Sequence, residues 1–257
     1  MSENHPVAPA WRPFVSMNVA ESADGKIAPI DKGKINFGSA EDRAQMEALR
    51  YEADAVLIGG GTLLAEDPPL LIRDPAIRDA RLASKGKPHP LNMTVCSSLP
   101  TALAEMQFFR CADTEKLVFT TERTPPELLD AARTLARVEV VPLTDAGRVD
   151  LVEVVRRMPA MGIRHLLLEG GGELNFSMLE ANLVDEVYLT ICPFLFGGRH
   201  APSPVDGAGF PRDHVRKLVL KSHRAGTHGE LFLRYAVLPD APTVTPSRLF
   251  PRGVELG

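Results

Sequence analysis

Three consecutive glycines follow a carboxylate and a short apolar run, and this pattern has a clear chemical meaning. Residues 166–168 predict a buried strand, Glu169 follows it, and residues 170–172 lead towards a helix that starts near Asn175. A strand that passes through glycines into a helix brings unpaired backbone N–H groups to one point, where the helix dipole also favours an anion. The pattern therefore predicts a phosphate site. A tight strand-to-helix turn without a ligand would show the same glycines, and the spacing is not the G-x-G-x-x-G of a Rossmann fold.

Composition and charge exclude several classes of function. The chain has 257 residues, of which 44% are hydrophobic and 24% charged, which is ordinary for a globular protein. Its net charge of −4 provides no basic field for nucleic acid or for an anionic membrane. No apolar run approaches the roughly 18 residues that a membrane span requires. The first residues do not have the pattern of a signal peptide.

The cysteines and histidines do not suggest a metal site. Cys96, Cys111 and Cys192 are odd in number and widely spaced, so they form neither metal-type pairs nor a disulfide framework. The histidines form no metal-binding constellation either. We expect no metal, a reducing cytoplasmic location, and thiols that act as small apolar filler.

The elements that must position the glycine segment alternate along the chain. Apolar runs predict strands, and capping residues or prolines mark helix starts. Strands are expected at 14–20, 55–58, 91–96, 117–121, 138–142, 163–168, 187–191, 215–222 and 230–237. Helices are expected at 39–51, from Pro125 to about residue 136, at 151–158 and after residue 175. The charged stretch 74–90 contains Pro75 and Pro88 and is expected to be an irregular surface excursion.

This order of elements predicts the fold class. Strands alternate with helices up to residue 191 and strands alone follow, which favours an α/β fold with one mostly parallel sheet and an antiparallel C-terminal edge. No internal repeat or long linker interrupts the pattern. We expect a flexible tail at 1–12, one domain at 13–238 and a proline-rich tail at 239–257.

Six segments, taken in order, resemble the motifs of the riboflavin-pathway pyrimidine reductases. Residues 50–59 (RYEADAVLIG) resemble LRxxADAILVG, residues 61–70 (GTLLAEDPPL) resemble GTVLADDPRL, and residues 168–172 (LEGGG) resemble VEGG. The other matching segments are 18–20 with 24–26, 183–186 with 196–198, and 201–210. The resemblance covers residues 14 to about 235, and the last segment looks most like the stand-alone archaeal and fungal-type reductases.

The resemblance implies a fold, a cofactor and a reaction. The fold is dihydrofolate-reductase-like, with helices on both faces of the sheet, and the protein is a homodimer. NADPH donates a hydride to C1′ of a ribosylamino-pyrimidine 5′-phosphate, giving the ribitylamino form. The sugar ring must first open to an imine, which requires a proton transfer near the sugar. The zinc deaminase signature that many bacterial relatives carry, His-x-Glu with Pro-Cys-x-x-Cys, does not occur in this sequence.

The resemblance also implies a role for each matching residue. Glu66 and Asn18 are expected to be catalytic, Glu66 by handling or orienting a proton and Asn18 by bonding a ribose hydroxyl. The substrate-binding residues are expected to be Lys34, Arg50, Leu70, Arg73 and Glu169, with the two arginines on the phosphate. The cofactor-binding residues are expected to be Ala20, Asn36, Thr62, Ser97, Gly170, Gly171, Gly172, Glu173, Leu174, Asn175 and Ser177.

Several residues depart from the family pattern, mainly on the substrate side. Glu66 replaces an aspartate, Pro69 replaces a frequent arginine, and Cys96 replaces an aspartate. Lys34 and Asn36 stand where bacterial members have serine and tryptophan. Because a shift of about 1 Å can be costly in a packed site, two alternatives remain open. One is a paralogue that reduces another small imine or carbonyl, and the other is a non-catalytic NADP-binding protein.

Overall fold

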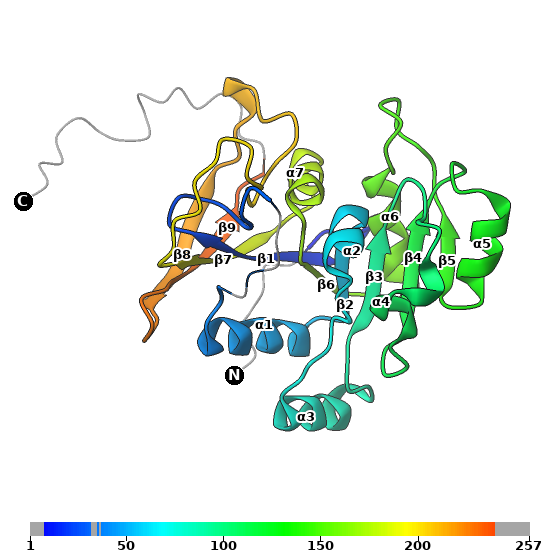
Figure 1. Ribbon diagram of the computed structural model, residues 1–257, viewed down its shortest axis with the longest axis horizontal. Helices are drawn as coiled ribbons and strands as arrows, with labels where there is room; N and C mark the ends of the chain where they lie inside the picture. The colour runs from blue at the N-terminus through cyan, green and yellow to red at the C-terminus, as the bar shows by residue number, and fades with distance from the viewer. Residues whose placement is uncertain (1–7, 32–34, 36, 240–257) are drawn as a thin grey trace, which may run out of the picture.

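A single twisted sheet runs through the centre of the protein (Figure 1). The computed structural model describes residues 8–31, 35 and 37–239. Within these residues the sheet has nine strands in the order β5-β4-β3-β2-β6-β1-β7-β9-β8. The pairs β7–β9 and β8–β9 are antiparallel, and the other neighbours are parallel. The expected α/β fold, with a mostly parallel sheet and an antiparallel C-terminal edge, is confirmed.

Every strand expected from the sequence is present, with ends shifted by a few residues. The strands are β1 (Phe14–Ser22), β2 (Ala55–Gly59), β3 (Leu91–Val95), β4 (Lys116–Thr120), β5 (Arg137–Val140), β6 (His165–Leu168), β7 (Glu186–Cys192), β8 (Leu218–Ala225) and β9 (Leu231–Val237). The helices are α1 (Ala40–Glu52), α2 (Gly60–Glu66), α3 (Pro75–Lys85), α4 (Gln107–Arg110), α5 (Pro126–Arg133), α6 (Leu151–Arg157) and α7 (Gly172–Glu180). Three short 3₁₀ segments are η1 (Leu103–Glu105), η2 (Met158–Met161) and η3 (Arg212–His214). No helix of the described residues is long and apolar enough to cross a membrane.

Helices cover both faces of the sheet, as expected. Adjacent residues of a strand point to opposite faces, so β2 contributes to two hydrophobic clusters. Leu57 belongs to the cluster that includes residues of α6 and α7. Val56 and Ile58 belong to the cluster that includes residues of α1, α2, α4 and α5. Because both faces are covered, the central strands are continuous apolar runs rather than alternating ones.

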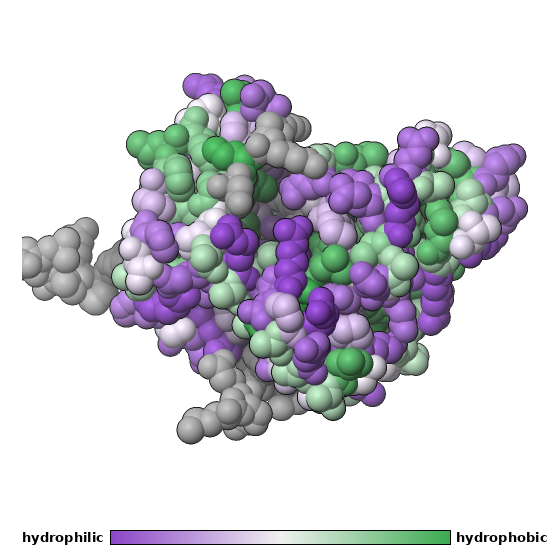
Figure 2. Space-filling view, turned by 60° about the horizontal axis from the view of Figure 1, so that its bottom comes forward, coloured by the Kyte–Doolittle hydropathy of each residue, from purple (hydrophilic) through white to green (hydrophobic). Residues whose placement is uncertain are grey.

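The segment after residue 74 differs from the expectation. The sequence predicted an irregular excursion over 74–90, whereas the structure has helix α3 there. Asp74 caps its first turn, Pro75 is its first residue, and Gly86 ends it with a φ of 72°. Arg81 is its one buried residue, and polar side chains gather on the face that α1 and α3 form (Figure 2). None of its apolar residues is buried, and the clearest sequence signals of the helix are the cap, the proline and the glycine.

Residues 24–26, which follow β1, contact residues 196–198, which follow β7, although the two motif segments are far apart in the sequence. The Asp24 carboxylate accepts hydrogen bonds from Ser22 Oγ (2.6 Å) and from the backbone N–H groups of Phe196 (3.0 Å) and Gly197 (2.7 Å). The hydroxyl of Ser22 and these two N–H groups lower the pKa of Asp24 to about 2. The Asp-Gly-Lys turn thus holds the later glycine pair in place.

The strand order places a topological switch at the centre of the sheet. From β2 the chain proceeds outward through β3 and β4 to β5, and β6 then returns to lie between β2 and β1. β7 continues on the other side of β1. Connections that leave in opposite directions open a crevice at the carboxyl ends of such strands, where α/β proteins bind their ligands.

A buried ion pair fixes the start of β1. Arg12, next to the expected domain boundary at residue 13, is buried and donates to both carboxylate oxygens of Asp185, at 2.6 and 2.7 Å. The backbone N–H of Val15 donates to the same carboxylate at 2.8 Å. Asp185 therefore ties the entry of the chain to the segment that precedes β7.

We predict that Asp185→Asn lowers the free energy of unfolding by about 3 kcal/mol, because it leaves the buried Arg12 guanidinium uncompensated. The measurement is equilibrium unfolding in urea. Asp130→Asn is the matched control, because Asp130 pairs with Arg133 on the surface, and it should change the free energy by less than about 1 kcal/mol. Equal losses in the two variants would contradict this account.

Candidate active site

A large cleft opens at the carboxyl ends of β1, β2, β3 and β6. Its volume is about 1660 Å³, above the roughly 300–1,000 Å³ of an ordinary small-molecule pocket. Its walls include α2, α7, the loop at 67–73 and the hairpin at 144–150. The cleft has room for two ligands side by side, as a transfer reaction between them requires.

The cleft brings together most of the site residues expected from the sequence. Those that line it are Asn18, Ala20, Thr62, Glu66, Arg73, Ser97, Glu169, Gly170, Gly171, Gly172, Glu173, Leu174, Asn175 and Ser177. They come from β1, α2, the segments after β3 and β6, and α7, which are widely separated in the sequence. Lys34 and Asn36 lie outside the described residues. Arg50 and Leu70 are not among the lining residues.

Arg50 binds protein groups through three of its nitrogen atoms. Its guanidinium is buried, and Nε and Nη2 donate to the two oxygens of Glu169, each at 2.7 Å. Its third nitrogen, Nη1, donates to the carbonyl oxygen of Leu71 at 2.7 Å. A substrate phosphate would have to displace Glu169 to reach this arginine. Arg50 therefore fixes the orientation of Glu169, and its expected contact with a substrate phosphate stays a prediction.

Leu70 also differs from the expectation. It is 2% exposed and its side chain packs in the hydrophobic cluster with α1 and α2, so the side chain does not line the cleft. Its backbone has a φ of 47°, in the left-handed region that leucine rarely adopts. The neighbouring contacts must therefore hold this conformation.

Buried polar side chains supply those contacts along the loop between α2 and α3. Asn92 Nδ2 donates to the carbonyl oxygen of Pro69 at 2.8 Å, and His89 Nδ1 accepts from the backbone N–H of Ile72 at 3.2 Å. The Glu47 carboxylate accepts from the backbone N–H groups of Arg73 (3.0 Å) and of the next residue (2.8 Å). The loop is thus fixed on both sides of Arg73, whose side chain is exposed at the cleft.

Reasoning from the sequence missed Glu47, His89 and Asn92. All three are buried, and their partners lie on a loop distant in sequence. One signal was available, because Asn92 interrupts the apolar run of β3, and a buried polar residue usually has a specific partner.

The glycine segment forms the wall of the cleft at the start of α7. Gly170 has a φ of 86°, which few residues other than glycine tolerate. A Cβ atom on Gly171 would lie 3.1 Å from Thr62 Oγ1, and one on Gly172 would lie 2.4 Å from the carbonyl oxygen of Ser203. The helix begins at Gly172, three residues before the expected start at Asn175, and no described side chain caps it. Its first N–H groups are therefore available to an anion.

Asn175 leaves a further acceptor in this wall. Its side chain is 1% exposed, and Nδ2 donates to the carbonyl oxygen of Pro204 at 2.8 Å. Its Oδ1 is buried and has no hydrogen-bond partner among the described residues. Buried polar atoms are rarely left unpaired, so this oxygen is available to a donor from a ligand or a water.

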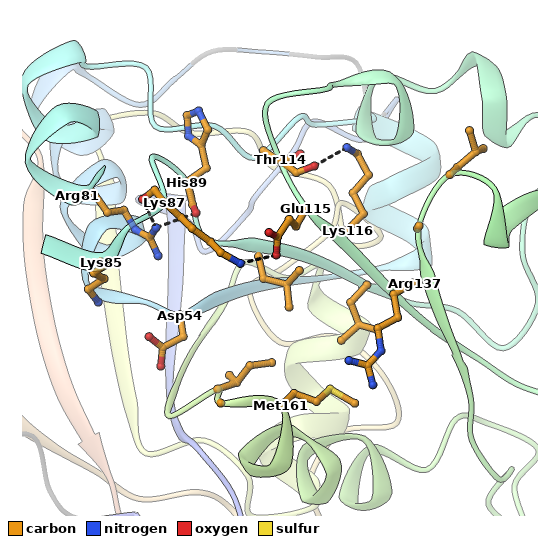
Figure 3. Close-up of a pocket in the computed structure, with 16 residues that line it drawn as sticks. Asp54, Arg81, Lys85, Lys87, His89, Thr114, Glu115, Lys116, Arg137 and Met161 are labelled. Atoms are coloured by element: carbon orange, nitrogen blue, oxygen red, sulfur yellow. Dashed lines mark hydrogen bonds and ion pairs between the residues drawn. The ribbon is translucent and has the colours of Figure 1, made fainter. Parts of the chain in front are cut away.

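A second, smaller cavity of about 610 Å³ lies at the amino ends of β3, β4 and β5 (Figure 3). It is rich in cations, but these already bind protein groups. Arg81 donates to the carbonyl oxygens of Ala53, Lys87 and His89, and Lys87 pairs with Glu115 at 2.6 Å. Ala53 ends α1, so Arg81 complements a helix C-terminus. This cavity therefore has a structural explanation, and the cleft is the candidate active site.

Comparison with known proteins shows the family and the fold. The RibD C-terminal domain family matches residues 13–232. The chain is 36% identical over 230 residues to the 2,5-diamino-6-ribosylamino-4(3H)-pyrimidinone 5′-phosphate reductase of Methanothermobacter thermautotrophicus, covering 88% of this chain and 99% of the relative. It is 33% identical over 199 residues to the protein of the same name from Archaeoglobus fulgidus, covering 77% and 89%. A pyrimidine reductase-like protein from Corynebacterium diphtheriae has the same fold, with a TM-score of 0.75, 20% identity, and coverage of 93% and 97%.

The reactivity of the three thiols tests whether Cys96, which lines the cleft, is as buried as the structure shows. Cys96 lines the cleft and lies against Gly60, where a Cβ would be 2.8 Å from Sγ. Burial raises the pKa of Cys96 to about 11 and that of Cys192 to about 12.

Since the thiolate is the reactive form, we predict that iodoacetamide at neutral pH labels the partly exposed Cys111 and spares Cys96 and Cys192. Mass spectrometry reads the result, unfolded protein labelled at all three sites is the control, and labelling of native Cys96 would contradict the prediction.

Proposed function

The chain belongs to the RibD C-terminal domain family of riboflavin-biosynthesis pyrimidine reductases, and on this premise we propose that it reduces 2,5-diamino-6-ribosylamino-4(3H)-pyrimidinone 5′-phosphate with NADPH as the hydride donor. The protein is an oxidoreductase of a family that uses a nicotinamide cofactor; NADPH and the diamino substrate are the specific parts of the proposal. One observation supports them: a glycine-lined helix start and Glu169, which the buried Arg50 holds by two hydrogen bonds, line the same cleft.

The wall at α7 suits the pyrophosphate of a dinucleotide. A Cβ would be tight against Thr62 at Gly171 and would clash with Ser203 at Gly172, the helix start has no cap among the described side chains, and Asn175 Oδ1 still needs a donor. Residues 170–174 would hold the cofactor by backbone N–H groups, and Thr62 and Ser97 by hydroxyls. When bound, the cofactor supplies the hydride, and the protein supplies position and charge.

Arg73 is the best-placed described residue for the 5′-phosphate of the substrate. It lines the cleft with an exposed side chain, and its backbone is fixed by Glu47. A guanidinium group binds two phosphate oxygens at once. Lys34, which lies outside the described residues, remains a proposed second contact.

Glu169 is proposed to bind an amino group of the pyrimidine or a sugar hydroxyl. Arg50 donates one hydrogen bond to each carboxylate oxygen of Glu169. Each oxygen therefore keeps a second lone pair that can accept a hydrogen bond from the substrate. Glu169 and Arg50 have side chains about a tenth exposed, so the ion pair fixes the direction in which the carboxylate points. An amino group suits an ionised carboxylate, which only accepts hydrogen bonds.

Glu66 and Asn18 are proposed to serve the proton transfer. Glu66 is exposed at the end of α2, Asn18 lies on β1, and both line the cleft. Opening of the ribose ring requires a proton on the ring oxygen, and the carboxyl of Glu66 can hold it there. The longer side chain of Glu66, compared with the family's aspartate, gives this group its reach from the helix end. Asn18 would bond a sugar hydroxyl and keep C1′ in line for the hydride.

We further propose a homodimer in the cytoplasm. β8 is exposed along its length and carries apolar Leu218, Val219 and Leu220, each more than 40% exposed. An apolar edge strand of this kind is a natural surface for a second copy of the chain. The three cysteines are free, which suits a reducing compartment.

The proposal predicts NADPH oxidation, followed by absorbance, when purified protein receives the diamino ribosylamino-pyrimidine 5′-phosphate. The deaminated form is tested in parallel and should react more slowly, because it replaces an amino group that Glu169 would bind. Saturable NADPH binding without turnover of either form would contradict the proposed substrate. Turnover of the deaminated form alone would mean that Glu169 does not bind the amino group that this form lacks.

A second prediction concerns the loop that carries Arg73. Glu47→Gln replaces one of two buried acceptors by a donor, and a lost buried hydrogen bond is worth about 1–3 kcal/mol. We expect KM for the substrate to rise about tenfold while kcat changes little, because the loop positions a binding residue. Glu52→Gln, an exposed glutamate of the same helix, is the control and should change neither. An unchanged KM in Glu47→Gln would show that the loop does not depend on this carboxylate.

A further inference from the structure

The half of the cleft away from the substrate residues carries a cation with no assigned role. This half is lined by Ser97 and Ser98 after β3, by the hairpin at 144–150, and by Ser177 and Glu180 of α7. Arg148, on the hairpin, is its only arginine or lysine among the described lining residues. Arg73, on the substrate side, is the only other one in the cleft as described.

The hairpin presents Arg148 from a fixed backbone. Thr144 and Arg148 are joined by two hydrogen bonds, from Thr144 N to Arg148 O (2.7 Å) and from Arg148 N to Thr144 Oγ1 (3.2 Å). Leu143 and Val149 form an antiparallel bridge beside them. Gly147 turns the hairpin with a φ of 71°, and a Cβ there would lie 2.5 Å from Arg123 Nη2. The base of the Arg148 side chain therefore has little freedom to move.

The guanidinium of Arg148, by contrast, is held only loosely. Nη1 lies 3.3 Å from Ser177 Oγ, and Nη2 lies 3.4 Å from Glu180 Oε2. Both charged side chains are about half exposed, at 51% and 50%. These contacts are longer than the 2.7 Å bonds of Arg50. An anion could therefore recruit Arg148 without breaking a strong ion pair.

The distance of Arg148 from the start of α7 suits the geometry of a bound dinucleotide. Ser177, which Arg148 contacts, lies five residues after Gly172, about 8 Å along the helix at ~1.5 Å per residue. If the pyrophosphate lies at the helix start and the nicotinamide points towards Asn18 and Glu66, the adenosine half must occupy the side of Arg148. In NADPH a single ribose separates the pyrophosphate from the 2′-phosphate.

We propose that Arg148 binds the 2′-phosphate of the dinucleotide and thereby makes the cleft selective for NADPH over NADH, an inference that rests on the proposed function. An arginine near the ribose accommodates the 2′-phosphate in other dinucleotide sites, whereas an acidic residue bonds the free 2′-hydroxyl. Glu180 is such an acidic residue, 3.4 Å from Arg148. Arg148 and Glu180 therefore act in opposite directions on the choice of cofactor.

The test measures Kd for NADPH and for NADH, without substrate, in wild type and variants by isothermal titration calorimetry. Arg148→Gln should weaken NADPH binding by about tenfold or more, the worth of a charge-assisted hydrogen bond, and leave NADH within about twofold. Glu180→Gln should shift the ratio of the two Kd values towards NADPH. Arg156→Gln is the charge-matched control, because Arg156 pairs with Glu153 on α6 and does not line the cleft.

The outcomes separate this inference from the proposed function. Equal weakening of NADPH and NADH in Arg148→Gln, or no weakening of either, overturns the inference while the function stands. A wild-type protein that binds neither dinucleotide overturns both. A selective loss of NADPH binding in Arg148→Gln, with Arg156→Gln unchanged, supports the assignment.

Discussion

The buried ion pair between Arg50 and Glu169 is the interaction on which the cleft depends. Arg50 belongs to the last turn of α1, Glu169 follows β6, and the third contact of Arg50 is the loop carbonyl of Leu71. Neither charge is stable in this environment without the other, because a single buried charge is far more costly than a pair. The helix, the central strand and the loop are therefore held in one relative arrangement. The carboxylate that faces the cleft gains a fixed direction, which a flexible surface glutamate would lack.

On the proposed function, the cleft offers three kinds of anion recognition along its length. Arg73, a guanidinium on a loop held by Glu47, would serve the substrate side. Backbone N–H groups at the start of α7 would serve the middle, where the glycines allow close approach. Arg148, a loosely held guanidinium, would serve the far side. The chain as a whole is acidic, with a net charge of −4, so these local donors, rather than a general basic field, must select phosphorylated ligands.

The sequence predicted the sheet well because strands such as β2 and β6 are short apolar runs with a glycine segment soon after them. It missed α3 because that stretch is charged and contains prolines, although Asp74, Pro75 and Gly86 are the residue types that start and end a helix. It could not show that the Arg50 guanidinium binds Glu169, since a motif match gives the position of a residue and not the direction of its side chain. Glu47 and His89 were invisible for a related reason: their partners are backbone groups of a loop distant in sequence.

The measurement that tests this account most directly compares kcat/KM of Arg50→Lys and Arg73→Lys with the 5′-phosphorylated substrate and with the same compound lacking its phosphate. If Arg73 binds the phosphate, its variant should lose activity on the phosphorylated compound only. If Arg50 orients Glu169, its variant should lose the same factor on both compounds, because lysine cannot reproduce the paired bonds. An Arg50→Lys penalty that disappeared with the phosphate would contradict the account, because it would return Arg50 to the substrate phosphate.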